Sequence, residues 1–193
     1  MERKHPHFKT YRHAIIKLLV LEPEINVFEP LPDGAQLKYI DISQHLQSAA
    51  QNAIANHLAQ KGFAVSKACP DALKNPTISS VTTLFRAVNR SIQLHTFGPQ
   101  IFPGKIKNFD YSVGSVAGIL KQANADGLVL AMGYQSGSAE IKETWFSIAV
   151  SNQEGQIIWY HMLSSHPKIN HRRAEGMLEL VNEIMIRFWN SGQ

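Results

Sequence analysis

Apolar residues recur every three or four positions in four segments of the chain, which is the spacing of one buried face of an α-helix. The clearest segment covers residues 44–61, where leucine, isoleucine and alanine follow one face. Ser43 precedes it at a position typical of a helix cap, and Gly62 follows it as a typical stop. We predict a helix here and three further helices, over residues 77–96, 113–123 and 172–189.

Shorter runs rich in valine, isoleucine and leucine lie between these segments and predict strands. Two late runs flank a polar turn at residues 151–155, so we expect an antiparallel hairpin there. Residues 133–137 are small and polar, and we expect them to form a loop. The expected strands cover residues 15–21 and 25–28, as one long or two short strands, and residues 63–65, 128–132, 145–150 and 156–163, with a further edge piece at 37–40.

The order of these elements predicts a single domain of the α/β class with some α+β character. It should contain a mixed central sheet of about five strands, helices on both faces and a late antiparallel hairpin. A chain of 193 residues with 44% hydrophobic residues can fill one core, and no linker or repeat divides it. We place this domain over residues 14–190 and expect residues 1–13 to form a basic, flexible amino-terminal segment.

The net charge of +4 comes from lysines and arginines that are scattered along the chain. Nucleic-acid binding normally needs a basic stripe on one face, so this distribution argues against such a partner. Arg172 and Arg173 lie where the last predicted helix begins, the end at which the helix dipole disfavours cations. They indicate contact with an anionic partner, although a solvated face fits them as well. Trp189 fits the rim of the core or a further partner contact.

A basic segment precedes the apolar residues 14–21, as in a signal peptide, but Lys17 interrupts the run and no small-residue cleavage site follows. We therefore expect a core strand. No run approaches the ~20 apolar residues of a membrane-spanning helix. The chain as given is expected to be soluble and to reach a membrane only through an anchor that this sequence lacks. The single cysteine, Cys69, cannot form a disulfide within the chain.

The sequence contains no motif of high specificity for catalysis, nucleotides or metals. His161, His166 and His171 recur every five residues, a spacing that fits neither one helical face nor one strand face, so we expect no metal site. Gly114 and Gly118 lack the lysine and hydroxyl residue of a phosphate loop. Close packing of a helix against the sheet explains both glycines.

We therefore expect no catalytic residues, no cofactor and a non-enzymatic protein. The serine in the segment that starts at Gly133 stands at the wrong position for a nucleophile elbow, and no helix follows it. The alternative that the sequence leaves open is a small-ligand-binding protein or an enzyme with a site near Gly133 and His161.

Three segments carry a resemblance to a known group: residues 110–114, residues 125–130 and the hairpin strand around residues 152–159. The chain resembles bacterial envelope lipoproteins related to the curli-secretion lipoprotein and to the amino-terminal domain of the Tol-system propeller protein. The resemblance implies a non-enzymatic module of the periplasm or outer membrane that binds an envelope protein partner or forms a homo-oligomer. The signal and lipid-attachment cysteine of that group are absent from this sequence.

Overall fold

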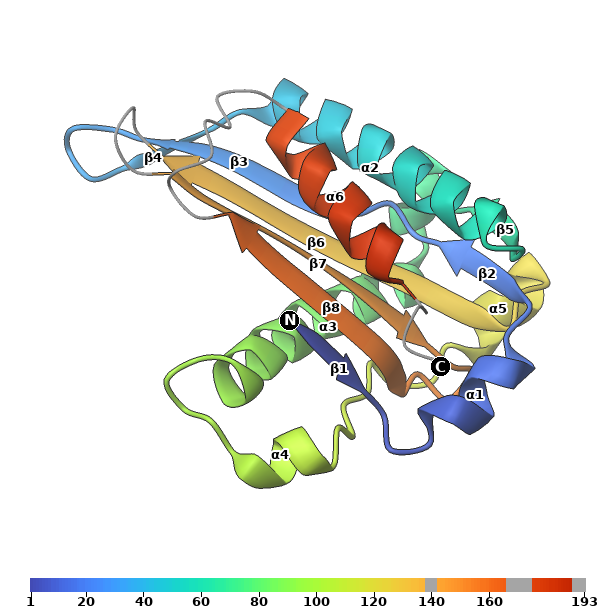
Figure 1. Ribbon diagram of the computed structural model, residues 1–193. Coiled ribbons are helices and arrows are strands. Elements are labelled where there is room, and N and C mark those ends of the chain that lie inside the picture. Colours follow the sequence, from blue (N-terminus) through green and yellow to red (C-terminus); the bar gives the residue numbers. More distant parts are fainter. Residues whose placement is uncertain (138–141, 166–174, 189–193) are drawn as a thin grey trace.

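The computed structural model describes residues 1–137, 142–165 and 175–188. These residues form one mixed sheet of eight strands with helices on both faces (Figure 1). The strands are β1 (Glu2–Lys4), β2 (Lys17–Val20), β3 (Glu24–Pro30), β4 (Gln36–Lys38), β5 (Ala64–Lys67), β6 (Gly127–Gly137), β7 (Lys142–Ser151) and β8 (Ile157–Ser165). The helices are α1 (Phe8–Ala14), α2 (Ile40–Gln60), α3 (Pro76–Thr96), α4 (Pro103–Lys107), α5 (Ala117–Ala123) and α6 (Glu175–Arg187), with a 3-10 turn at Pro70–Lys74.

The sheet order is β1-β8-β7-β6-β2-β5, and β3 pairs with both β6 and β4. Strand β2 runs parallel to β5 and β6, and β3 runs parallel to β6, whereas β6, β7, β8 and β1 alternate in direction. The predicted class, the single domain and the late hairpin are confirmed. The strand count exceeds the expected five because the first run forms two strands, the predicted edge piece forms β4, and the three-residue β1 is too short to show an apolar alternation.

Strand β6 is the centre of the sheet, and β2 and β3 lie end to end along one side of it. Leu18 to Val20 pair with the start of β6, and Glu24 to Phe28 pair with its second half. Pro23 lies in the break between them. Of the two predicted alternatives, one long strand or two short ones, the structure therefore has the two short strands.

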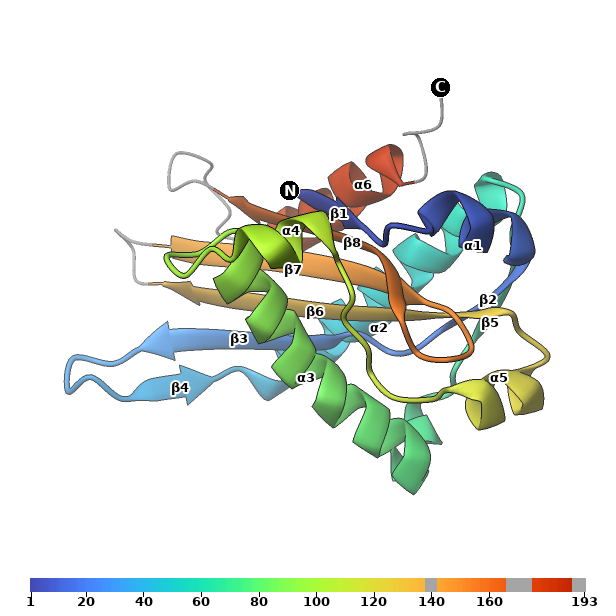
Figure 2. The same cartoon turned by 90° about the horizontal axis from the view of Figure 1, so that it is seen from below.

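The two faces of the central strands belong to two separate cores. Val129 and Ala131 on β6 pack toward α2 and α6, while Leu128 and Leu130 pack toward α3 and α5. Successive side chains of a strand point to opposite faces, so a central strand covered on both sides is apolar at every position. Figure 2 shows α3 crossing the face opposite α2 and α6.

The ends of the long helices follow ordinary capping chemistry. Gly62 has φ +90°, and the Phe63 N–H donates to the Leu58 carbonyl, which is the predicted glycine stop of α2. The start was predicted wrongly, because α2 begins at Ile40 and Ser43 lies inside its first turn.

The helix predicted over residues 113–123 begins only at Ala117. Upstream, the backbone runs along the turn of the β7–β8 hairpin, where Val113 N–H donates to the Gly155 carbonyl. Gly114 has φ +74°, and a Cβ on Gly155 would lie 1.7 Å from the Gly114 oxygen. Gly118 has no neighbouring atom within 4 Å of such a Cβ, so helix packing does not explain these glycines.

The loop predicted at residues 133–137 is instead the second half of β6. Gly133 is buried, and a Cβ there would lie 2.7 Å from Phe146 and 3.0 Å from the sulfur of Met177. The glycine lets α6 approach the sheet closely, so it serves packing and not flexibility.

The amino-terminal residues lie on the sheet. Strand β1 pairs antiparallel with β8, and Phe8 of α1 is buried. The Arg3 guanidinium lies 4.4 Å from the centre of the Phe97 ring and donates to the Thr96 carbonyl, which ties β1 to the end of α3. Among the described residues, no helix combines the length and the hydropathy needed to cross a bilayer.

Candidate interaction surface

The hairpin formed by β3 and β4 projects from the sheet beyond the helices (Figures 1 and 2). In its turn, the Leu31 N–H donates to the Ala35 carbonyl and the Gly34 N–H donates to the Leu31 carbonyl, while the Asp33 carboxylate accepts from the Ala35 N–H. Gly34 supplies the positive φ that the turn requires. The projection is therefore a defined structure with its own hydrogen bonds.

The projecting hairpin and the start of α2 expose large aliphatic side chains. We define the hairpin patch as Leu31, Leu37, Ile40 and Ile42, which are between 38% and 60% exposed. Within the described part of the chain, β4 pairs only with β3, so its outer edge is open. Grouped apolar exposure and an open edge are both typical of contact surfaces.

The segments that carry the hairpin patch also carry acidic side chains. Glu29 belongs to β3, Asp33 to the turn and Asp41 to the first turn of α2, with Lys38 as a nearby cation. The Tyr39 hydroxyl donates a short hydrogen bond to Glu29, which raises the pKa of Tyr39. The patch is apolar, and the segments that carry it are acidic overall.

A second exposed apolar group lies around α4. We define the α4 patch as Ile101, Phe102 and Ile106, which are between 38% and 53% exposed. The Phe102 ring meets the His95 ring of α3 edge-on, with centroids 4.9 Å apart. Beside it lies an open depression of about 520 Å³, lined by His95, Phe102, Pro103, Gly104, Lys105, Asn108 and Asp110.

The two charged side chains that line the α4 depression, Lys105 and Asp110, bind each other. Lys105 Nζ lies 2.7 Å from Asp110 Oδ1, and this hydrogen bond lowers the pKa of the Asp110 carboxyl. The single carboxylate of the lining is thus neutralised by its neighbour. Lys107, at the exposed end of α4, adds a further positive charge.

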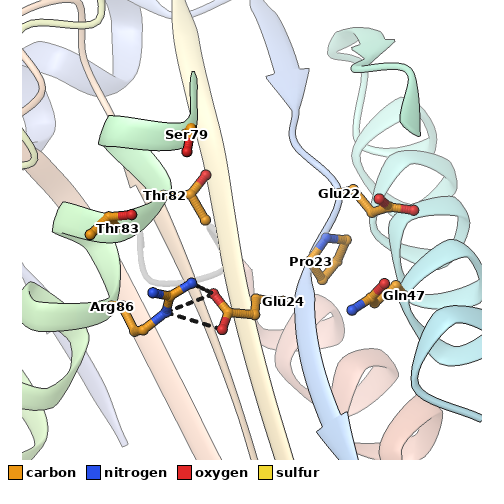
Figure 3. A pocket seen from close by; sticks show the side chains of 8 residues that line it. All are labelled: Glu22, Pro23, Glu24, Gln47, Ser79, Thr82, Thr83 and Arg86. Carbon is orange, nitrogen blue, oxygen red and sulfur yellow. Dashed lines mark hydrogen bonds and ion pairs between the residues drawn. The ribbon is translucent and has the colours of Figure 1, made fainter. Parts of the chain in front are cut away.

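A smaller pocket of about 190 Å³ lies at the break between β2 and β3 (Figure 3). Arg86 reaches from α3 to Glu24 on β3, with Nε and Nη2 at 2.9–3.0 Å from its oxygens. Because the guanidinium and carboxylate bind each other through two nitrogens, the charge of Arg86 is already compensated. The pair links α3 to the sheet.

Polar side chains of α2 complete the outer edge of the sheet where no strand covers it. Ser43, Gln47 and Gln51 recur at a spacing of four and face this edge. The Val27 N–H donates to Ser43 Oγ (3.1 Å), Gln47 Nε2 donates to the Ile25 carbonyl (3.2 Å), and Gln51 Nε2 donates to the carbonyls of Val20 and Ala68 (3.1 Å each). Ser43 and Gln47 thus replace the partners that a strand would offer on the outer side of β3, and Gln51 links the ends of β2 and β5.

The alternative site near Gly133 and His161 receives no geometric support. Both residues are buried in strands. Neither lines the α4 depression, the pocket between β2 and β3, or a third, open depression that is formed by side chains of α3 alone. Among the residues that the structure describes, His161 has no hydrogen-bond partner at either ring nitrogen, and burial lowers its pKa to about 4. His166 and His171 lie outside the described residues. The described residues contain no cluster of three potential metal ligands.

A buried polar group joins α3 to the sheet. Asn89 Oδ1 accepts hydrogen bonds from the hydroxyls of Ser147 (2.9 Å) and Tyr160 (2.8 Å). Burial raises the pKa of Tyr160, so this hydroxyl stays a donor. The one sequence signal was an asparagine on the apolar face of the predicted helix.

The predicted partner contacts Arg172, Arg173 and Trp189 lie outside the described residues. The two patches that the structure reveals were missed because their residues lie in segments rich in proline, glycine and charge. The hydrophobic leucine at position 37 inside such a segment was the available signal.

No protein-family model matches the sequence, and no curated protein matches it either. Among solved structures, the chain is similar to the PelC dodecamer from Paraburkholderia phytofirmans, with a TM-score of 0.44, 11% identity, and coverage of 96% of this chain and 92% of that one. Lipoprotein GNA1162 from Neisseria meningitidis gives a TM-score of 0.44 and 11% identity over 92% and 99% of the two chains. The LpoB C-terminal domain from Salmonella enterica gives a TM-score of 0.34 and 14% identity, with coverage of 83% of this chain and 93% of that domain.

Proposed function

We propose that this chain is a non-enzymatic binding or assembly module of the bacterial cell envelope, and that it engages its partner through the β3–β4 hairpin. The observation that carries the proposal is the hairpin patch, the four exposed aliphatic side chains of the hairpin and of the first turn of α2 that follows it. Covering side chains that are about half exposed recovers roughly 1 kcal/mol each, or about 4 kcal/mol for the patch. The open edge of β4 offers main-chain hydrogen bonds in addition.

The envelope location rests on the resemblance of the sequence to envelope lipoproteins. Arg172, Arg173 and Trp189 remain proposed contacts for the same partner, because a basic pair and an indole suit an anionic protein surface.

The test is site-specific photo-crosslinking of the full chain in the bacterium that produces it. A photoreactive residue replaces Leu37 in one variant and Ile16 in a control. Ile16 is 63% exposed and directly precedes β2, which pairs with the start of β6, whereas β3 of the hairpin pairs with its second half. We expect covalent adducts from position 37 in the envelope fraction and none from position 16. Equal adducts from both positions, no adduct from position 37, or recovery in the cytosol alone would each refute the proposal.

A further inference from the structure

Residues 72–109 contain no aspartate and no glutamate, and all 15 acidic residues of the chain lie outside this span. The span covers α3 and α4. Its basic side chains are Lys74, Arg86, Arg90, Lys105 and Lys107. A surface formed by these two helices therefore carries cations without a carboxylate from its own segment.

Carboxylates of neighbouring segments neutralise three of these cations. The ion pairs are Lys74–Asp71, Arg86–Glu24 and Lys105–Asp110, with nitrogen–oxygen distances of 2.7–2.9 Å. Arg90 and Lys107 are exposed and form no ion pair with any residue that the structure describes. The uncompensated positive charge of this surface therefore comes from Arg90 on α3 and Lys107 on α4.

Residues 99–108 project from the packed layers of the fold. All of them are exposed except Lys105, which is partly buried, and α4 has no buried residue. Figure 1 shows α4 and the loop before it standing away from the sheet, beyond the carboxyl end of α3. The Phe102 N–H donates to the His95 carbonyl (2.9 Å), and the two rings pack edge-on, so α3 holds the projection in place.

The projection presents the apolar side chains of the α4 patch with cations beside them. Phe102 and Ile106 lie four positions apart, and the Ile106 N–H donates to the Phe102 carbonyl, so the two side chains share one face of α4. Lys107 follows Ile106 directly. His95 lines both the α4 depression and the depression of α3 to which Arg90 contributes, so the surface that carries Arg90 adjoins α4.

Apolar side chains on a projection with cations next to them suit the surface of an anionic bilayer. The apolar groups enter the boundary between the headgroups and the acyl chains, and the cations meet the lipid phosphates. An anionic polymer would offer charge but would leave the apolar side chains in water. A protein interface of ordinary size uses about 20–30 residues on each side, which is more than this projection supplies.

We propose that residues 99–108 dock the protein on an anionic phospholipid surface, with Ile101, Phe102 and Ile106 in the interfacial layer and Arg90 and Lys107 at the phosphates. This contact goes beyond the proposed function, and it departs from the expectation that only an anchor would bring the chain to a membrane. The hairpin lies at the opposite edge of the sheet, so it stays free for a protein partner while α4 rests on the bilayer.

Sedimentation with lipid vesicles tests the contact on the purified full chain. We expect the chain to pellet with vesicles made of equal parts of phosphatidylcholine and phosphatidylglycerol. The bound fraction should fall as salt is added, because salt screens the attraction between the cations and the lipid. Vesicles of phosphatidylcholine alone should bind the chain at least about tenfold more weakly, since they offer no net negative charge to Arg90 and Lys107.

Substitutions separate the apolar contribution from the charged one. Phe102→Ser should weaken binding to the mixed vesicles about tenfold, the effect of withdrawing one large apolar side chain that is half exposed in the free protein. Lys107→Gln should weaken it about fivefold, the effect of one cation near an anionic surface. The matched controls Ile16→Ser and Lys121→Gln change exposed residues before β2 and on α5, and both should bind like the wild-type chain.

An environment-sensitive fluorophore measures insertion directly. The exposed Cys69 is replaced by serine, and the label is attached to Ile106→Cys or, as the control, to Ile16→Cys. We expect the mixed vesicles to shift the emission to shorter wavelength at position 106 and to leave it unchanged at position 16. Thermal unfolding of every variant checks that the fold is retained, as expected for substitutions of exposed side chains.

The proposal fails if the wild-type chain does not pellet with the mixed vesicles, if Phe102→Ser binds like wild type, or if the emission at position 106 does not shift. Binding to heparin that requires Lys107 but not Phe102, without binding to vesicles, would make an anionic polymer the occupant and overturn the proposal. Because the crosslinking test of the proposed function concerns Leu37 at the other edge of the sheet, failure of vesicle binding leaves that function standing.

Discussion

His161 lies on β8, opposite Glu2 of β1, in a setting that holds the imidazole neutral. It is 3% exposed, and the described part of the chain offers no hydrogen-bond partner to either nitrogen. Burial is the main cause of its low pKa, and the amino-terminal ammonium group and Arg187 of α6 add repulsion, whereas Glu2 opposes the shift. Protonation of His161 is therefore more favourable in the unfolded chain than in the folded one.

The free energy of unfolding should decrease as the pH falls from about 6.5, the ordinary value, to about 4, the folded value. The neutral, buried His161 contributes about 3 kcal/mol to the free energy of unfolding at a pH above the unfolded pKa. This contribution is lost as the pH falls through the folded pKa. Urea denaturation over this range measures it. His161→Phe should flatten the dependence, whereas substitution of the exposed His45 by Phe should not; an unchanged slope in His161→Phe would contradict the assignment.

Asn89 gives a second prediction at the level of single residues. Asn89→Leu leaves the buried hydroxyls of Ser147 and Tyr160 without their acceptor, so the free energy of unfolding should fall by about 1–3 kcal/mol. Tyr160→Phe removes only one donor and should cost about 1 kcal/mol. Chemical denaturation measures both, and a neutral Asn89→Leu variant would show that the hydroxyls find other partners.

At the level of elements, α2 does more than cover the sheet, because its side chains bond the free edge of β3 and the ends of β2 and β5. Gln51→Leu removes a donor from the carbonyls of Val20 and Ala68 in a site that is only 8% exposed, and the Val20 carbonyl keeps the Ala68 N–H. We expect a loss of about 1–3 kcal/mol in unfolding free energy, measured by urea denaturation. The exposed Gln44 on the same helix is the control, and Gln44→Leu should stay within about 0.5 kcal/mol of wild type. Equal losses in the two variants would contradict the edge role of Gln51.

Alanine substitutions at Gly155 in the β7–β8 turn and at Gly118 in α5 should change the stability of the protein in opposite directions. Gly155→Ala should destabilise the protein by more than about 2 kcal/mol, since its φ is +77° and its Cβ would overlap the Gly114 carbonyl. Gly118→Ala in α5 should stabilise it by about 0.4–1 kcal/mol, because the site is open and helical. Thermal unfolding compares the two, and equal effects would contradict the described turn.

At the level of the whole molecule, the sheet separates two cores and leaves two apolar patches at its opposite edges. Its central strands are covered on both faces, so the exposed apolar groups of the hairpin and of α4 lie outside the helix layers. This arrangement suits a building block whose contacts are made by its ends. The Glu24–Arg86 pair and the α2 side chains hold the sheet edge next to the hairpin in place.

The sequence allowed the fold class, the long helices and the β7–β8 hairpin to be predicted. It did not allow the length of α5, the strand character of residues 133–137 or the pairing of β1. In each of these cases the decisive partner is distant in sequence: the turn at Gly155 for Val113, Phe146 and Met177 for Gly133, and β8 for β1. The hairpin patch and the α4 patch were missed for a related reason. The exposure of a side chain depends on whether a distant segment of the chain packs against it.

What the sequence determined by itself is the period of the main helices and strands and the face that each one buries, because the spacing of apolar side chains records the faces that leave water. The tertiary structure alone decided which backbone groups find partners at the sheet edges, where α2 side chains replace a strand, and which aliphatic groups of the hairpin and of α4 stay in solvent. Those outcomes depend on contacts between segments far apart in the chain, and local spacing carries no record of them.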